Sequence, residues 1–243
     1  MNWNRETLKG DFSLANSWFK DNREKVFCIV TGDEKWIFYD NPKKKKYYAK
    51  PDQSLSNSTS TPNIHGSKIM LCIWWDQKDS CLLWAAETWR LSGDRYRLQS
   101  IRLSRALREK RPEYEQRHDK VILLHDNARP HVAKVVTKYL ETLKWDVLPH
   151  PLYSPDIALS DYWLFRRMQH DLSSHRFTSF AEIENWLQNW IASKDKSFFR
   201  DGIRKLSERW EKIVGSDGQY FNWSVHSFCF EINVFFTQKN GPN

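Results

Sequence analysis

The first half of the chain alternates short runs of β-branched and aromatic residues with turn-forming sequence, which is the pattern of strands joined by loops. Between the first two runs, GDEK interrupts the apolar residues, and Gly32 marks the turn that we expect between two strands. The uninterrupted apolar run that ends at Leu124 is typical of a strand buried on both faces. The runs that predict strands are Val26–Thr31, Trp36–Tyr39, Ile69–Trp75, Cys81–Ala85, Val121–Leu124 and Val147–Leu148.

Helical periodicity dominates the second half, where apolar residues recur every three to four positions. Pro130 favours the start of a helix, and the apolar residues that follow have the i, i+3, i+4, i+7 spacing. Ser179 and Glu182 form a capping-box signature ahead of another apolar stripe. We expect helices over residues 94–111, 130–143, 160–172, 180–191 and 196–214. This order of elements predicts a single mixed α/β domain over residues 25–221.

Composition narrows the class of protein. Apolar residues make up 40% of the 243 residues, with 13 Trp, 14 Phe and 9 Tyr, which excludes disorder of the whole chain. A mean hydropathy of −0.73 and the lack of an 18-residue apolar run exclude an ordinary membrane span. Lys and Arg outnumber Asp and Glu by 38 to 30, and the net charge of +8 favours a polyanionic partner such as nucleic acid.

Three aspartates lie where the pattern predicts strand ends and a helix start. We expect Asp33 at the end of the first strand, Asp126 after the buried strand and Asp161 at the start of a helix. Carboxylates gathered on rigid elements bind Mg²⁺ or Mn²⁺, and a pair of such ions supports phosphodiester cleavage. Spacing alone leaves a second interpretation open, in which Asp33 and Asp126 are turn and cap residues.

Longer sequence motifs favour the metal-binding interpretation. The runs VTGDEKWIFYDNPKKKKYY, IMLCIWWDQ, REKRPEY, HDNARPHVAK, LPHPLYSPDIALSDYWLF and FFRDGIRKLSERWEK follow one another in this order from residue 30 onwards. With the 34 residues that separate Asp126 from Asp161, they resemble the catalytic domain of mariner-family transposases. Asp33 matches the aspartate of GDEKW, Asp126 that of HDN and Asp161 that of SDY.

The resemblance implies an α/β fold of the RNase H-like, retroviral-integrase type, with a mixed sheet flanked by helices. It implies an enzyme that hydrolyses DNA phosphodiesters at transposon ends and then transfers the strand through the freed 3′-hydroxyl. Asp33, Asp126 and Asp161 would be both the catalytic residues and the ligands of two Mg²⁺ or Mn²⁺ ions. The implied partners are transposon-end and target DNA and a second copy of the chain, in a homodimer on DNA. The implied location is the nucleus.

Two clusters of cations are candidates for DNA contact. Lys43, Lys44, Lys45 and Lys46 precede two tyrosines within the irregular stretch 41–68, which resembles the clamp loop of mariner transposases. The lysine run also fits a nuclear localisation signal. Eight further cations lie between residues 90 and 111. The alternative for each cluster is a solvated charged surface without a partner.

The residues that surround the second aspartate each have two interpretations. Asn127 and Arg129 are candidates for contact with substrate phosphates, with a structural role as the alternative. His125, His131 and His150 lack the tight spacing and the second ligand pair of a zinc site. We therefore expect these histidines to pack or to hydrogen-bond the loop or DNA.

The sequence also departs from the mariner pattern. Residues 1–24 are too few for the paired helix-turn-helix domains that precede the catalytic domain in this family. Leu159 and Trp163 replace a proline and a histidine around SDY, and residues 222–243 form an aromatic tail that we expect to be weakly packed.

These departures leave an alternative function open: a domesticated or decaying remnant that binds nucleic acid with little or no cleavage. A remnant of a methyltransferase–mariner fusion is a third interpretation, although the sequence contains no methyltransferase region.

Overall fold

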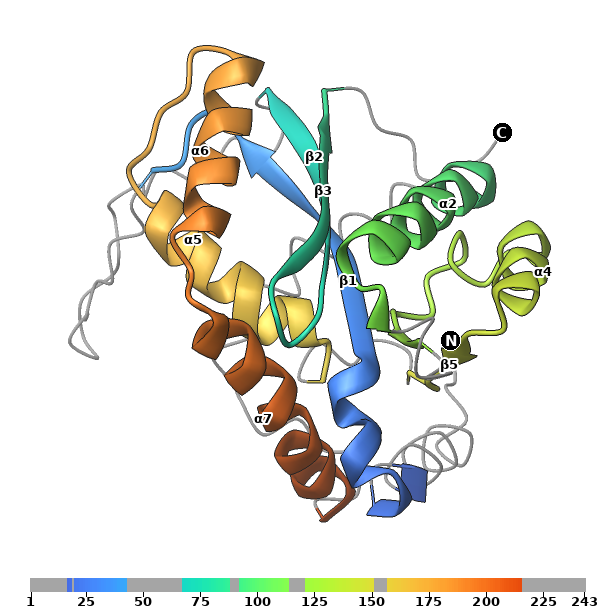
Figure 1. Cartoon of the computed structure of the whole chain (residues 1–243). Coiled ribbons are helices and arrows are strands. Elements are labelled where there is room, and N and C mark those ends of the chain that lie inside the picture. Colours follow the sequence, from blue (N-terminus) through green and yellow to red (C-terminus); the bar gives the residue numbers. More distant parts are fainter. Residues whose placement is uncertain are drawn as a thin grey trace, which may run out of the picture.

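The computed structural model describes residues 17–18, 20–42, 67–87, 92–113, 121–150 and 157–215. These residues form a mixed five-stranded sheet with helices on both faces (Figure 1). The strands are β1 (Ile29–Phe38), β2 (Lys68–Trp75), β3 (Ser80–Ala86), β4 (Ile122–Leu124) and β5 (Asp146–Val147). The helices are η1 (Arg23–Cys28), α2 (Gly93–Lys110), α4 (Lys134–Leu143), η2 (Ser160–Phe165), α5 (Arg166–Leu172), α6 (Phe180–Ala192) and α7 (Lys196–Gly215).

Strand β1 lies at the centre of the sheet, whose spatial order is β3-β2-β1-β4-β5. The hairpin strands β2 and β3 extend the sheet on one side by antiparallel pairing. On the other side, β4 pairs in parallel with β1, and β5 pairs in parallel with β4; α4 connects β4 to β5. The sheet is therefore mixed, as the resemblance implied, and its parallel half begins at β1.

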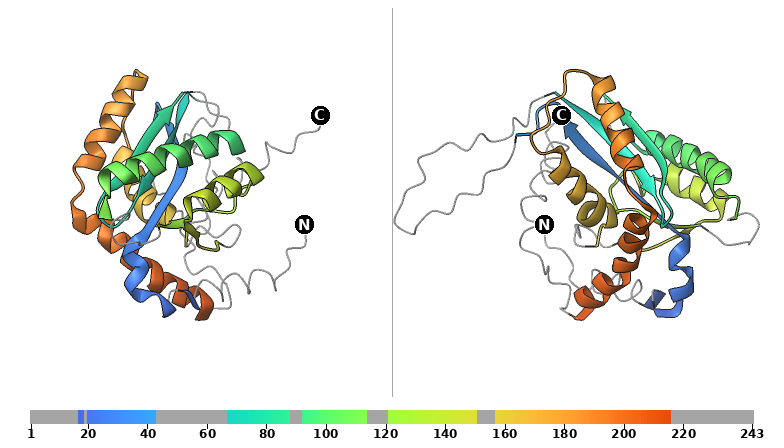
Figure 2. Two further views of the ribbon diagram at one scale, coloured as in Figure 1. Left: turned by 45° about the vertical axis from the view of Figure 1, so that its right-hand side comes forward. Right: turned by 60° about the vertical axis from the view of Figure 1, so that its left-hand side comes forward.

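Each face of the sheet has its own apolar core. In β2, Leu71, Ile73 and Trp75 face the core that η2, α5, α6 and α7 cover. The alternate residues Cys72 and Trp74 face the smaller core under α2 and α4. Figure 2 shows the two groups of helices on opposite sides of the strands. Period-two alternation thus decides which helix layer each side chain of a strand meets.

Most of the predicted elements are confirmed to within a residue or two. The strands of the hairpin, the helix predicted over 94–111 and the helix predicted over 196–214 correspond to β2, β3, α2 and α7. At the start of α6, the Ser179 Oγ accepts a hydrogen bond from the Glu182 N–H at 3.2 Å, as the capping box predicts.

The predicted turn at Gly32 is wrong, because β1 runs without interruption through GDEK. Residues 23–28 form the 3₁₀ helix η1 instead of the start of a strand. Gly32 serves a different purpose from a turn: a Cβ at this position would lie 2.2 Å from the Trp74 Cδ2. The glycine lets the indole of the neighbouring strand lie directly over the backbone of β1, which is a packing role.

The helix predicted from Pro130 begins four residues later, at Lys134. Residues 129–132 form turns instead, and the side chain of His131 points back to the residues after β4. The residues after Pro130 therefore belong to the turn that holds His131, and the helix begins only after this turn.

Some expectations fall outside the described residues. These are most of the N-terminal segment 1–24, Lys43–Lys46 with most of the loop 41–68, and the tail 222–243. Within the described part, no helix combines the length and the apolar character that a membrane crossing needs.

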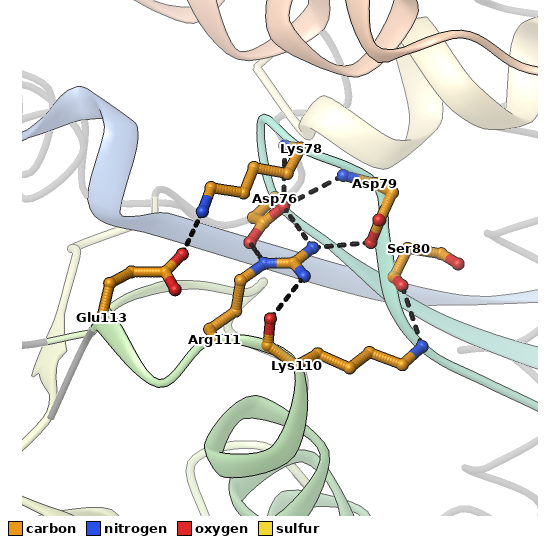
Figure 3. A network of polar contacts seen from close by, with 7 residues as sticks. All are labelled: Asp76, Lys78, Asp79, Ser80, Lys110, Arg111 and Glu113. Carbon is orange, nitrogen blue, oxygen red and sulfur yellow. Dashed lines mark hydrogen bonds and ion pairs between the residues drawn. The ribbon is translucent and has the colours of Figure 1, made fainter.

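A buried ionic network joins the end of α2 to the β2–β3 hairpin (Figure 3). The Arg111 Nε donates to the Asp76 Oδ2 at 2.6 Å, and the Arg111 Nη2 reaches the Asp79 Oδ1 at 2.6 Å. The side chain of Asp76 is 0% exposed and that of Arg111 is 5% exposed. Asp76 also accepts the N–H groups of Lys78 and Asp79, so it closes the turn as well as pairing with the guanidinium.

This network generates a stability prediction. Arg111→Ala should lower the free energy of unfolding by about 3–5 kcal/mol, because it leaves a buried carboxylate without its guanidinium partner. Lys78→Ala is the matched control in the same network, since the Lys78 side chain is 51% exposed and pairs with Glu113 at the surface. Its effect should stay within about 1 kcal/mol. Urea denaturation measures both, and equal losses would contradict the assignment.

Candidate active site

The strand register brings the first two aspartates side by side. Thr31 of β1 pairs with Leu124 of β4 in the parallel part of the sheet. Asp33 and Asp126 each lie two residues beyond this pair, on two neighbouring segments that run in the same direction. Asp33 therefore lies inside β1, although the sequence predicted it at a strand end, whereas Asp126 follows the end of β4 as expected.

The third aspartate comes from the helix layer that covers this face. Asp161 lies in the first turn of η2, which is wound as a π-helix and packs on β1. The Trp75 Nε1 donates a hydrogen bond to the buried Ser160 Oγ at 3.2 Å, which joins this turn to β2. Single π-turns occur mainly at functional sites, where they redirect one side chain. The turn here carries Asp161 toward the edge where Asp33 lies.

The three carboxyl groups are close enough to affect one another's ionisation. Burial, and then the charges of Asp161, Asp126 and Glu34, raise the pKa of Asp33 well above its usual range. Burial also raises the pKa of Asp161 to about 7; the Lys35 charge opposes this shift and the Asp126 charge adds to it. Two of the three acids thus resist ionisation at this edge of the sheet.

Asp126 behaves in the opposite way. Burial alone would raise its pKa, but the charge and hydrogen bond of His131 and the Ala128 N–H hold it well below the usual range. The Ala128 N–H donates to the Asp126 Oδ1 at 3.0 Å, and the His131 Nδ1 contacts the same oxygen. The side chain of Asp126 is still 39% exposed, so an ionised carboxylate faces solvent at the site.

As the side chains stand, the described residues contain no group of three His, Cys, Asp or Glu side chains close enough to hold a metal ion. The assignment of Asp33, Asp126 and Asp161 as metal ligands therefore stays a prediction. The donor set itself suits Mg²⁺ or Mn²⁺, since all three groups offer carboxylate oxygens.

Other predicted site residues have less direct roles. The Asn127 Nδ2 donates to the His150 carbonyl oxygen, so this side chain holds the loop together. Arg129 is exposed in the turn after Asp126. The lysines at 43–46 lie outside the described residues. Only the structural alternative for Asn127 thus has direct support.

Sequence reasoning overlooked Lys35, which lies two residues after Asp33 on the same face of β1. Its side chain is buried, and its Nζ lies 5.7 Å from the centre of the Phe165 ring in η2. Its charge acts on Asp161 and lowers the pKa of that carboxyl group, against the effect of burial. The signal was present, because period-two alternation from Asp33 places residue 35 on that face.

The chain is similar to known transposases in both sequence and structure. A family profile described as "Transposase (partial DDE domain)" matches residues 38–117. The mariner Mos1 transposase of Drosophila mauritiana is 53% identical over 195 residues, which are 79% of this chain and 56% of that protein. The crystal structure of the catalytic domain of Mos1 mariner transposase matches with a TM-score of 0.75 and 43% identity, over 91% of this chain and 98% of that one. The chain belongs to the mariner transposase family.

A mariner catalytic domain has the RNase H-like fold, and the described sheet and helices confirm that prediction. The Mos1 mariner paired-end complex with Mn also matches, with a TM-score of 0.80 and 46% identity over 91% of this chain and 65% of that one. The chain spans little more than half the length of the Drosophila mariner protein.

The two residues near Asp161 that depart from the mariner pattern both pack in or against the apolar core. Leu159 is 1% exposed within the apolar core. The Trp163 Nε1 donates to the Phe198 carbonyl oxygen at 2.9 Å, and its ring lies against Gly202 of α7, where a Cβ would come within 2.6 Å of the Trp163 Cδ1. The larger side chain at position 163 is therefore accommodated on α7, away from the acids.

The raised pKa of Asp161 gives a pH prediction for the metal-free protein. The folded state holds this proton more tightly than the unfolded state, so its contribution to stability is complete below about pH 4 and is lost as the pH rises to about 7. The stability of Asp161→Asn relative to the parent should therefore increase across this window and then level off. A gain on the order of 1–2 kcal/mol is expected after solvent screening. Thermal unfolding at several pH values measures it, and a difference that does not vary with pH would refute the assignment.

Proposed function

We propose that this chain is a metal-dependent DNA endonuclease and strand-transferase domain that acts at transposon ends. One observation carries the proposal: the charges of Asp126 and Asp161 both act on Asp33 and raise its pKa, in a chain of the mariner family. Perturbed carboxyl groups that are brought together from separate elements are typical of catalytic sites.

In this proposal, Asp33, Asp126 and Asp161 would hold two Mg²⁺ or Mn²⁺ ions. When bound, such ions activate the attacking hydroxyl group and stabilise the leaving oxygen of a phosphodiester. Asp126, whose pKa is lowered, already presents an ionised carboxylate. Asp33 and Asp161, whose pKa values are raised, would release protons as a cation binds.

The remaining chemistry needs no nucleophilic side chain. Water attacks in the hydrolytic step and a DNA 3′-hydroxyl attacks in strand transfer, so no covalent enzyme intermediate forms. Lys35 partly offsets the negative charge of the acidic cluster from inside the protein. The chain's own contribution is to hold three carboxyl groups of opposed ionisation behaviour on rigid elements.

The proposed partners follow from the same family. DNA at transposon ends and at the target site would bind to this edge, with two copies of the chain assembled on it. The solved paired-end complex of the related Mos1 transposase with the left transposon end supports transposon ends as the partner. The proposed location is the nucleus, where such DNA lies.

A nicking assay tests the catalytic proposal. The chain should nick supercoiled DNA in the presence of Mg²⁺ or Mn²⁺, and Asp33→Asn should reduce the rate by about 100-fold or more, because a metal ligand contributes several kcal/mol to the transition state. Since Asp33 resists ionisation in the metal-free protein, the neutral amide should not lower stability. Asp126→Ala is less suitable, because it also removes the acceptor that His131 contacts.

Asp201→Asn is the matched control for this assay, since Asp201 lies on α7 with a side chain 51% exposed. It should nick at the parental rate. Binding of DNA by the parent without any metal-dependent nicking would instead favour the domesticated-remnant alternative.

Helix α2 carries most of the second cation cluster, which lies between residues 90 and 111. Arg95, Arg102, Arg105 and Arg108 are all exposed, and the spacing of 95, 102 and 105 places these three on one stripe of the helix. The Arg102 guanidinium also lies 5.3 Å from the centre of the Trp84 ring. A row of guanidinium groups on a rigid helix suits the phosphates of a DNA backbone.

A salt titration tests this surface. Replacing Arg102 and Arg105 by alanine should weaken binding to all duplex sequences alike. The slope of log K against log salt should become shallower by about 0.9 for each phosphate that the variant no longer neutralises. The control pair is Arg166 and Arg167, which are exposed on α5 across the sheet. Equal weakening by the control pair would show that overall charge, and not the α2 surface, drives binding.

A further inference from the structure

The face of β1 opposite to Asp33 carries a second carboxylate. Glu34 follows Asp33 directly, so alternation turns its side chain under α2 and α4, where it is only 6% exposed. The Glu34 Oε1 is buried and has no hydrogen-bond partner in the described part of the chain. Burying a carboxylate costs free energy unless a cation or a hydrogen-bond donor pairs with it. The group that lies beside Glu34 is therefore important for this site.

That partner is His131, in the turn ahead of α4. The His131 Nε2 lies 3.2 Å from the Glu34 Oε2, and its other ring nitrogen, Nδ1, contacts the Asp126 Oδ1. The imidazole is 3% exposed and lies against the Tyr96 ring of α2, with the ring centres 4.0 Å apart. His131 therefore bridges two carboxylates, one buried and one that faces solvent at the acidic cluster.

The contacts made by Asp126 fix the orientation of its carboxylate. The hydrogen bonds that the Asp126 side chain receives from His131 and from the Ala128 N–H both end on Oδ1. A carboxylate held by one oxygen has a fixed orientation for its other oxygen. The contact between the His131 Nε2 and the Glu34 Oε2 is an ion pair without hydrogen-bond geometry, so the buried Glu34 acts on the imidazole through its charge.

We propose that Glu34 and His131 are positioning residues, which orient the Asp126 carboxylate so that its Oδ2 is presented to a divalent cation. This inference rests on the proposed function and extends it to two residues that neither bind the cation nor touch DNA. It also accounts for the presence of Glu34 in GDEKW and of His131 in HDNARPH, since each motif then supplies one metal ligand and one member of the bridge.

A role in packing alone would give a different expectation. If the bridge only filled the core, apolar residues of similar volume would serve as well or better, because a buried ion pair seldom adds net stability. Both interpretations predict some change in stability when His131 is replaced. Only the positioning role predicts a change in metal affinity, so affinity is the deciding measurement.

The experiment titrates the whole chain with Mn²⁺ and follows free Mn²⁺ by electron paramagnetic resonance, with no DNA present. His131→Phe keeps the ring against Tyr96 but removes the contact with Asp126, and it should weaken Mn²⁺ binding by about 10-fold or more. His131→Gln retains a side-chain N–H donor and should recover much of the affinity. Glu34→Gln removes only the buried charge and should give a smaller loss than His131→Phe.

Tyr96→Phe is the matched control within the same buried cluster. It removes the hydrogen bond between the Tyr96 Oη and the His125 Nδ1, 2.7 Å long, without touching the bridge to Asp126. Its melting temperature should fall while its Mn²⁺ affinity stays at the parental value. The melting temperatures of all variants, measured without metal, separate losses of stability from losses of affinity.

The outcomes distinguish this inference from the proposed function. If the parent binds Mn²⁺ at a site that Asp33→Asn abolishes, and His131→Phe binds it equally well, the positioning role is overturned and the proposed function stands. If the parent has no such site, the positioning role and the proposed function are both overturned. Should His131→Phe fail to fold, Glu34→Gln decides: reduced affinity supports the bridge, and parental affinity overturns it.

Discussion

The parallel pairing of β1 with β4 is the constraint on which the rest of the structure depends. It places two aspartates that are far apart in the sequence at the same level of the sheet, two residues beyond the pair of Thr31 and Leu124. A shift of one residue in this register would turn Asp33 away from the acidic edge and bring Glu34 into its place.

The acidic edge is arranged for charge that the protein itself does not neutralise. Burial and neighbouring carboxylates keep Asp33 and Asp161 from ionising, whereas Asp126 is ionised beside His131. A fold that gathers such groups loses stability by doing so, and the loss is typical of functional sites. Lys35 on one face of β1 and His131 on the other limit this loss without removing it.

The two helix layers contribute different residues to the structure. The layer of η2, α5, α6 and α7 supplies Asp161 and the larger apolar core. The layer of α2 and α4 carries the exposed arginines and covers the Glu34–His131 bridge. Arg111 joins α2 to the β2–β3 hairpin through two carboxylates, so the basic helix is fixed to the sheet at its C-terminal end. The proposed DNA surface therefore belongs to the same rigid body as the acids.

The sequence by itself determined the class of fold, the hairpin strands, most of the helices and the three candidate aspartates. Those features rest on local periodicity and on motifs, which are properties of neighbouring residues. Only the tertiary structure decided that β1 runs straight through Gly32, because the reason is the Trp74 ring on another strand. It alone showed that Asp126 differs from the other two acids in ionisation, since burial and charge depend on residues brought together from four separate segments. The same holds for the contact between His131 and Glu34, because it joins the turn ahead of α4 to β1 and leaves no trace in the local pattern.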